Sequence, residues 1–385
     1  MRPLAPWAVK DVSLNRHPGD TLEIYEHSGL SSRLPVVKKF TDLTPDEVLL
    51  ALVQQLRPHL HNVIGVTIGK GGTGKTTLAS NLAFALAEQQ SQLAESGKPA
   101  LPILHLELDS NGNSRSDFGI RGTVFDDDGR AFYETLVDDR PFRVIRNVKP
   151  YLDVVPSGSV NGDISGAVSK LAGDHSLAAY LLLALLLAQI AHLYRWIIID
   201  FSPSDKSNQR LGLATATHLV APVKGSDHGV LEGLGTLAGL VRDIKKINPE
   251  VGIAAIGFLA FKKVKGEPTS ELTNLRRTIL AMVEEARIPP EVVLDDYIRE
   301  AAILAKQCRN GGMPAKELAL AALGILPDPE AREDEEDTMI PRPRDDNGRL
   351  IDPQKATDLA DDYTHLAGAV IRQVRRRNNL LKGAA

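Results

Sequence analysis

The 385-residue sequence contains one cysteine, Cys308. A single thiol excludes a disulfide framework and the multi-cysteine sites that hold metal ions or iron–sulfur clusters. The sequence also lacks an excess of positive charge, since 45 Lys and Arg stand against 49 Asp and Glu. A uniformly basic nucleic-acid-binding protein is therefore excluded, and any such surface must be local. Residues 1–10 hold two prolines and lack the apolar segment of a secretory signal, so we expect a cytoplasmic protein.

An apolar run at residues 177–190 falls short of a membrane span. It has about fourteen residues, whereas roughly twenty are needed to cross a bilayer. His192 and Arg195 follow it, and then an apolar strand pattern. We interpret the run as a buried helix of the core, not as a membrane anchor.

A glycine-rich segment lies between an apolar run and a helical run. Residues 69–77 read Gly-Lys-Gly-Gly-Thr-Gly-Lys-Thr-Thr, and residues 63–68 before them are apolar. The pattern G-x-x-x-x-G-K-[ST] is satisfied. Glycines let backbone N–H groups converge on phosphates, and the start of a helix adds partial positive charge. The segment therefore predicts a nucleoside triphosphate site made of Gly69, Lys70, Gly71, Gly72, Thr73, Gly74, Lys75, Thr76 and Thr77.

From residue 62 onward, apolar strand patterns alternate with helical patterns. This alternation predicts an α/β fold with a mostly parallel twisted sheet flanked by helices, in which ligands sit at the carboxyl ends of the strands. The expected strands are 63–68, 102–108, 151–155, 196–200, 218–223 and 252–260, and the expected helices are 75–95, 131–139, 166–172, 176–193, 230–247, 269–287, 298–308 and 314–324.

The composition divides the chain into four parts. Residues 1–61 are expected to form a short, mainly helical extension, with one helix from a capping box at Thr44 to Arg57. Residues 62–326 form the nucleotide-binding domain, and residues 327–362 an acidic, flexible insertion. Residues 363–385 hold a last helix, about 363–375, and a basic tail. Leu366, Val370 and Val374 are expected to pack this helix on the domain.

A second lysine makes the glycine-rich segment more specific. Lys70 stands five residues before Lys75, and Lys-Gly-Gly-Thr-Gly-Lys-Thr-Thr resembles the deviant Walker A motif of the ParA/MinD family of dimerising ATPases. The resemblance implies that Lys70 reaches across a homodimer interface to the partner's nucleotide. A second ammonium near the developing phosphate charge would act like an arginine finger in trans, so that hydrolysis awaits dimerisation.

Two strand ends resemble the family's other motifs. Residues 106–113 resemble its Asp-x-Asp-Pro-Gln-Gly-Asn switch segment, with Asp109 at the position of the carboxylate that orients the attacking water. Glu107 replaces the first Asp, and Ser110-Asn111 replaces Pro-Gln. Residues 196–200 followed by Phe-Ser-Pro-Ser resemble its Walker B strand. The implied cofactors are ATP and Mg²⁺, with Mg²⁺ bound by Thr76 and with Asp200 beside it or reaching it through water; the implied catalytic residues are Lys70, Lys75 and Asp109.

The resemblance weakens toward the base and the DNA-binding face. The family often carries Ile-Pro-Arg-x-x-Arg there, and residues 294–299 keep only the last arginine, Arg299. A phosphate-contacting strip for DNA is formed in this interpretation by Arg299, Lys306, Arg309 and Lys316, with plain solvation as the alternative. The tail combines arginines with Leu380 and Leu381. It favours DNA or solvation over a membrane contact.

These motifs indicate a ParA-type partition ATPase. The resemblance implies that its ATP-bound homodimer binds nonspecific DNA, and that a ParB-type centromere-binding adaptor triggers hydrolysis and release, segregating plasmid or chromosomal DNA on the nucleoid. The alternatives are a MinD-like membrane-cycling ATPase and an ATPase that positions another cargo. Metal-cluster carriers on the same scaffold need paired cysteines, and Cys308 stands alone.

Overall fold

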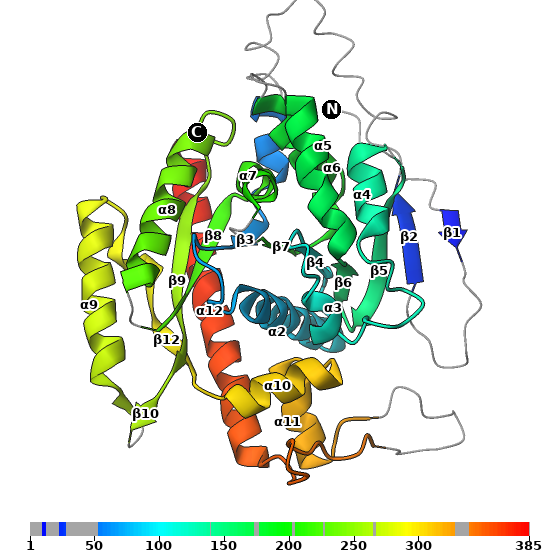
Figure 1. The fold of residues 1–385 in the computed structure, drawn as a ribbon, viewed down its shortest axis with the longest axis vertical. Coiled ribbons are helices and arrows are strands. Elements are labelled where there is room, and N and C mark those ends of the chain that lie inside the picture. Colours follow the sequence, from blue (N-terminus) through cyan, green and yellow to red (C-terminus); the bar gives the residue numbers. More distant parts are fainter. Residues whose placement is uncertain are drawn as a thin grey trace, which may run out of the picture.

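A computed structural model provides the structure of the protein (Figure 1). It describes residues 10–12, 23–27, 53–138, 140–172, 177–201, 205–225, 228–264, 267–327 and 339–384. The acidic cluster at 333–337 and most of the helix expected from Thr44 lie outside these residues. Of that helix, residues 53–56 are described and are helical.

In the described part of the chain, the main sheet has ten strands in the order β1-β2-β5-β6-β4-β7-β3-β8-β9-β12. The strands from β6 to β12 in this order are parallel, and β5, β2 and β1 extend the β6 edge in antiparallel pairing. The predicted α/β fold is confirmed. The strands are β1 (Lys10–Val12), β2 (Glu23–His27), β3 (Val63–Val66), β4 (Ile103–Glu107), β5 (Phe142–Lys149), β6 (Leu152–Val155), β7 (Trp196–Asp200), β8 (His218–Lys224), β9 (Gly252–Phe261) and β12 (Val293–Arg299), with a separate hairpin of β10 (Lys263–Val264) and β11 (Glu267–Pro268).

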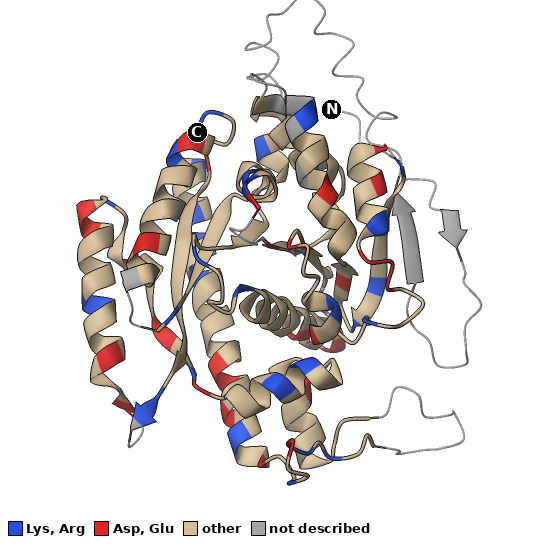
Figure 2. Ribbon diagram, viewed as in Figure 1, with Lys and Arg blue, Asp and Glu red and all other residues tan. Residues whose placement is uncertain are grey.

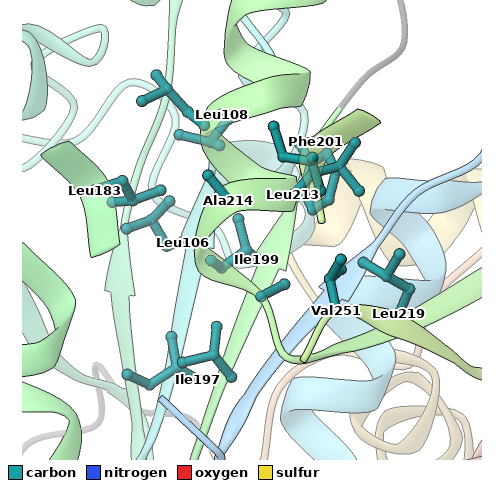
Figure 3. Close-up of a cluster of buried hydrophobic side chains, with 14 of the residues drawn as sticks. Leu106, Leu108, Leu183, Ile197, Ile199, Phe201, Leu213, Ala214, Leu219 and Val251 are labelled. Atoms are coloured by element: carbon teal, nitrogen blue, oxygen red, sulfur yellow. The ribbon is translucent and has the colours of Figure 1, made fainter. Parts of the chain in front are cut away.

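Helices cover both faces of this sheet, because its central strands carry apolar side chains on both sides. On β7, Ile197 and Ile199 enter the cluster of apolar side chains on one face (Figure 3), and Trp196 and Ile198 enter the cluster on the other. The first face is covered by α4 (Arg130–Val137), α5 (Gly162–Ala172), α6 (Leu182–Ile190), α7 (Lys206–Thr215), α8 (His228–Ile244) and α9 (Ser270–Glu285), and the second by α2 (Lys75–Glu95), α10 (Ala302–Gly311), α11 (Ala315–Leu323) and α12 (Pro353–Ala384).

The apolar run at 177–190 belongs to the core, as predicted. Leu183, Leu186 and Leu187 are at most 2% exposed. The single helix expected over 176–193 is wrong in detail. The structure has a 3₁₀ helix at Leu177–Leu181, then α6, then a second 3₁₀ helix at Ala191–Leu193. Among the described residues, no helix is both long and apolar enough to cross a membrane.

Two expectations about sheet elements are also corrected. The extension at 1–61 was expected to be mainly helical, yet its described part includes β1 and β2, which join the sheet through β5. The helix expected from residue 298 begins at Ala302, because residues 298–299 finish strand β12 beside β9. Strand β5 itself is not among the strands expected from the sequence.

The last helix is longer than predicted. It begins at Pro353, inside the segment assigned to the insertion, and runs to Ala384. The side chain of Asp352 accepts a hydrogen bond from the Gln354 amide at 3.0 Å, and proline at the first helical position lacks the N–H that would be left unsatisfied. Leu366, Val370 and Val374 are buried, which confirms their predicted packing. The four-part division of the chain stays a prediction.

Side-chain hydrogen bonds also hold helix α12 near its C-terminal end. Arg377 donates to the Thr217 carbonyl at 2.7 Å and to Nδ1 of His218 at 3.2 Å. Because that ring nitrogen accepts, the other one carries the proton and donates to the Asn378 side chain at 2.9 Å and the His61 carbonyl at 3.1 Å. These bonds attach the helix to the start of β8, at the edge of the sheet where the parallel strands begin.

Candidate nucleotide-binding site

The glycine-rich segment forms the turn between β3 and α2. Gly72 and Gly74 have φ of 73° and 83°, a left-handed conformation that favours glycine. At Gly69 the reason is close approach: its N–H donates to the Gly233 carbonyl of α8 at 3.1 Å, and a Cβ there would lie 2.6 Å from that oxygen. Glycine at these positions therefore allows the turn between β3 and α2, and α8 packs directly against the first residue of the turn.

The end of α2 at this turn suits an anion. The 21-residue helix begins at Lys75, and no described side chain caps its first amides. Unsatisfied N–H groups at a helix start, together with the helix dipole, attract phosphate. Lys75 is 7% exposed. Burial lowers the pKa of its ammonium, and the nearby carboxylates of Asp200 and Asp109 oppose that shift, so one cation and two carboxylates share this space.

Asp200 ends β7 next to the start of α2. Among the described residues, neither of its buried carboxylate oxygens has a hydrogen-bond partner of normal geometry, although the Thr76 hydroxyl is close enough to influence its titration. Burial raises the pKa of Asp200 to about 7, and Thr76 and Lys75 oppose the rise. A buried carboxylate without a partner is costly unless a cation joins it. The hydroxyl of Thr76 and the oxygens of Asp200 are the hard ligands that Mg²⁺ takes, so these residues fit that ion.

Asp109 lies two residues beyond β4. Its Oδ1 accepts hydrogen bonds from the Asn111 amide at 3.1 Å and from the Asn111 side chain at 2.9 Å. Its carbonyl accepts from the Ser157 hydroxyl at 2.7 Å. The carboxylate is thus held at the carboxyl end of the sheet, close enough to Lys75 to influence its charge. This is the side of the sheet where the sequence placed it.

Glu107 holds the start of helix α3, a contact that the sequence did not indicate. Its buried carboxylate accepts from the Asn113 amide at 2.9 Å and from the Ser114 amide and hydroxyl at 3.1 and 2.5 Å. These residues open the short helix α3 (Ser114–Asp117). Burial beside Asp200 raises the pKa of Glu107, and the bonds from Ser114 oppose the rise. Glu107 therefore fixes the far end of the loop that carries Asp109.

Lys70 lies along helix α8 of its own chain. A Cβ at Gly229 would overlap the Lys70 ammonium, and a Cβ at Gly233 would come within 3.2 Å of the Lys70 side chain. Two glycines one helical turn apart thus leave room for this lysine. The predicted contact with a second subunit is not tested by a single chain and stays a prediction.

A pocket of about 260 Å³ adjoins the glycine-rich turn. Gly74 and Thr77 form one side, α10 supplies Ala302, Ala305 and Cys308, and further lining comes from β8, β9, β12 and α12. An apolar pocket beside a phosphate site is suited to a flat base. Burial raises the pKa of the Cys308 thiol to about 12, so the only thiol of the chain sits here in its neutral form. No pattern in the sequence indicated this pocket.

The four cations proposed to contact DNA do not form one open strip. Arg299 bonds to Asp358 and, through Nε at 2.7 Å, to Asp362, which raises the pKa of its guanidinium. Lys306 pairs with an aspartate at 2.6 Å, and Arg309 reaches the nucleotide side of the molecule, where it contacts Thr77 at 3.4 Å. Lys316 is half-buried on α11. Figure 2 shows that basic and acidic residues are interspersed around α10 and the adjacent part of α12. Their DNA contacts stay predictions.

The fold and this site define a P-loop nucleotide-binding protein. A family model described as an AAA domain matches residues 61–253, about half of the chain. The chain is 29% identical over 237 residues to the chromosome partitioning protein ParA of Myxococcus xanthus, covering 61% of this chain and 77% of that protein. It is 30% identical over 201 residues to the sporulation initiation inhibitor protein Soj of Bacillus subtilis, covering 50% and 70%.

Solved structures agree on the fold. McdA from Cyanothece, in a complex with ATP, has a TM-score of 0.52 at 18% identity, covering 67% of this chain and 90% of that one. At this identity the likeness shows the fold alone. Together, the family model and the curated relatives place the chain in the AAA domain family, as a P-loop ATPase of the ParA/MinD type.

Proposed function

We propose that the protein is a Mg²⁺-dependent, ParA-type partition ATPase that dimerises on ATP. The observation that carries the proposal is the buried carboxylate of Asp200, which has no hydrogen-bond partner of normal geometry in the described part of the chain and lies beside Lys75 and Thr76 at the open start of α2. The ParA and Soj relatives support partition as the process, and a bound ATP in McdA supports the nucleotide.

Each residue then has a defined part in hydrolysis. The α2 amides and Lys75 bind the phosphates and hold them in one orientation. Thr76 and Asp200 would hold Mg²⁺, which supplies charge stabilisation to the phosphate oxygens when bound. Asp109, fixed by Asn111 and Ser157, orients the attacking water. The base occupies the apolar pocket beside Thr77.

The ParA and Soj relatives also support a DNA cycle as part of this proposal. The ATP-bound homodimer presents basic residues of both subunits to nonspecific DNA, and a ParB-type adaptor stimulates hydrolysis and release. Such a cycle implies that the protein associates with the nucleoid. Such binding is local and sensitive to salt, which is compatible with the net charge of −4.

The test is a gel shift on random-sequence DNA without nucleotide, with ADP and with a nonhydrolysable ATP analogue. The proposal expects a shift with the analogue alone. Equal mobility in all three conditions contradicts the DNA part.

One observation favours the second candidate, a MinD-like membrane-cycling ATPase. Leu380 is 60% exposed near the end of α12, one turn from Arg376, whose side chain is 50% exposed and pairs with Glu291 at 2.9 Å. An apolar residue beside a cation suits an anionic lipid surface. Co-sedimentation of the ATP-loaded protein with anionic vesicles, and no DNA shift, would favour this candidate over the first. A cargo-positioning role would require neither result.

A further inference from the structure

Arg309 occupies a point where three helices meet. From α10, its Nε donates to Asp117 Oδ1 at 3.0 Å and its Nη2 to the Thr77 hydroxyl of α2 at 3.4 Å. The other Asp117 oxygen accepts from the Ser80 hydroxyl of α2 at 3.1 Å. Asp117 is the last residue of α3, so its carboxylate joins that helix to both α2 and α10.

The Asp117 carboxylate depends on Arg309 for its charge balance. The Asp117 side chain is 11% exposed, and the Arg309 side chain is 43% exposed. Burial raises the pKa of Asp117, whereas Arg309 and the Ser80 hydroxyl oppose the rise. Removal of Arg309 would leave a nearly buried carboxylate with one neutral donor, which weakens the attachment of α3.

A backbone contact next to this pair brings α10 and α3 still closer. Gly312 follows α10 with φ of 59°, and a Cβ there would lie 2.6 Å from the amide nitrogen of Gly119. Gly119 comes two residues after Asp117. The ion pair and the glycine contact both join α10 to the segment of α3, so we expect a shift of α10 to move α3 with it.

The face of α10 that carries Arg309 also borders the pocket, because Ala305 stands one helical turn before Arg309. Ala305 and Cys308 line it, and Thr77 both lines the pocket and accepts the bond from Arg309. At its other end, α3 begins at the residues that Glu107 holds, directly after the loop of Asp109. A continuous set of contacts therefore runs from the pocket, through α10 and Arg309, to the segment that orients the water.

We propose that Arg309 is a positioning residue that makes the order of the Asp109 segment depend on a base in the pocket. The proposal rests on the proposed function, because it takes the pocket as the base site of a nucleoside triphosphate. The side-chain bonds of Arg309 go to Asp117 and Thr77, not to Lys75 or Asp109, so it acts through α3. The DNA contact expected for this arginine from the sequence stays a separate prediction.

Hydrogen exchange on the full chain tests the proposal without relying on turnover. Two Mg²⁺-containing ligands are compared, a nonhydrolysable ATP analogue and inorganic tripolyphosphate, which has no base. In the unsubstituted protein, the analogue is expected to slow amide exchange in residues 109–119 about tenfold more than tripolyphosphate does. In Arg309→Ala this additional slowing is lost, while the analogue still protects residues 69–77.

Lys306→Ala is the matched control. Lys306 stands three residues earlier on α10 and pairs at 2.6 Å with Asp346, a pair in which both side chains are more than half exposed. It is expected to keep the base-dependent protection. Arg309→Lys retains the positive charge but cannot make the bonds to Asp117 and Thr77 at the same time. This variant is expected to keep part of the base-dependent protection.

The outcomes distinguish a failure of the Arg309 proposal from a failure of the proposed nucleotide-binding function. Base-dependent protection that persists in Arg309→Ala overturns the inference. Equal protection of residues 109–119 by both ligands in the unsubstituted protein does so as well. A loss in Arg309→Ala that is the same with both ligands shows an ordinary structural ion pair. Absence of protection at residues 69–77 in the unsubstituted protein contradicts the nucleotide site itself, and the inference with it.

Discussion

The ammonium of Lys75 donates a hydrogen bond to the main-chain carbonyl of Lys70 at 3.2 Å. The lysine that opens α2 thus fixes the backbone of the residue that carries the second lysine of the loop. The two cations differ in surroundings: Lys75 is buried among carboxylates, and Lys70 lies over the glycines of α8. Substitutions at the two positions should therefore have different effects.

Replacement of Lys75 by alanine removes the buried cation at the phosphate site. We expect Lys75→Ala to weaken ATP binding at least about 100-fold, since charge-assisted bonds to phosphate are lost in a desolvated place. Isothermal titration calorimetry measures this directly. Near-normal affinity would refute the phosphate role of Lys75.

Lys70→Ala is expected to bind ATP and yet to stay monomeric. If the ammonium serves the partner's nucleotide, its loss should also lower turnover on the order of 10³-fold, as for other cations supplied in trans. Light scattering with a nonhydrolysable analogue gives the mass. A dimer of the usual mass in this variant would show that the contact across subunits is wrong.

Asp109→Ala is expected to accumulate as the ATP-bound dimer. Loss of the carboxylate that orients water should reduce phosphate release by about 10²- to 10³-fold, with ATP affinity little changed. Asn111→Ala is the companion variant, because it removes one of the bonds that hold this carboxylate and should have a smaller effect. Undiminished phosphate release in Asp109→Ala would remove this residue from the mechanism.

The bonds of His218 predict a loss of stability in acid. Burial, followed by the charge of Arg377, lowers the pKa of His218 from 6.5 to about 4. The unfolded chain therefore takes up a proton first, and the contribution of this residue is complete above 6.5 and lost as the pH falls toward 4. Between about pH 7.5 and about pH 5 the free energy of unfolding should fall by about 2 kcal/mol from this residue.

Urea unfolding at the two pH values measures that loss in the native protein and in His218→Gln. The glutamine variant is expected to show a correspondingly smaller decrease, whatever its stability at neutral pH. If both proteins lose the same amount, other groups, such as the buried His105, cause the acid sensitivity.

The sequence predicted α2 with both ends correct because a glycine-rich turn, a lysine and a regular apolar spacing all act within one short segment. Strand β5 was missed although Phe142 and Val144 alternate with exposed positions, since it joins the sheet only through neighbours that are antiparallel. The start of α12 had a local signal in Asp352-Pro353, which the acidic composition of the preceding segment obscured.

The candidate site likewise contains residues that have a local sequence signal and residues that have none. Lys75, Asp109 and Asp200 could be predicted as site residues because each stands at a strand end or a turn with a recognisable pattern. The places of Arg309 and Lys70 were not foreseen. Arg309 meets Asp117 across 192 positions of the chain, and Lys70 lies over glycines of a helix far along it, so neither contact leaves a local trace.

The attachment of α12 to β8 has a practical consequence for work on the basic C-terminus. Arg377 inserts between the start of β8 and the Glu250 carbonyl, whereas Arg375, two residues earlier, is exposed. A truncation before residue 377 would therefore remove the bonds that attach α12 to β8, as well as the surface charges of the C-terminus. Substitution of Arg375 alone leaves the bonds of Arg377 intact. Point substitutions, not truncations, can therefore reveal what the C-terminus binds.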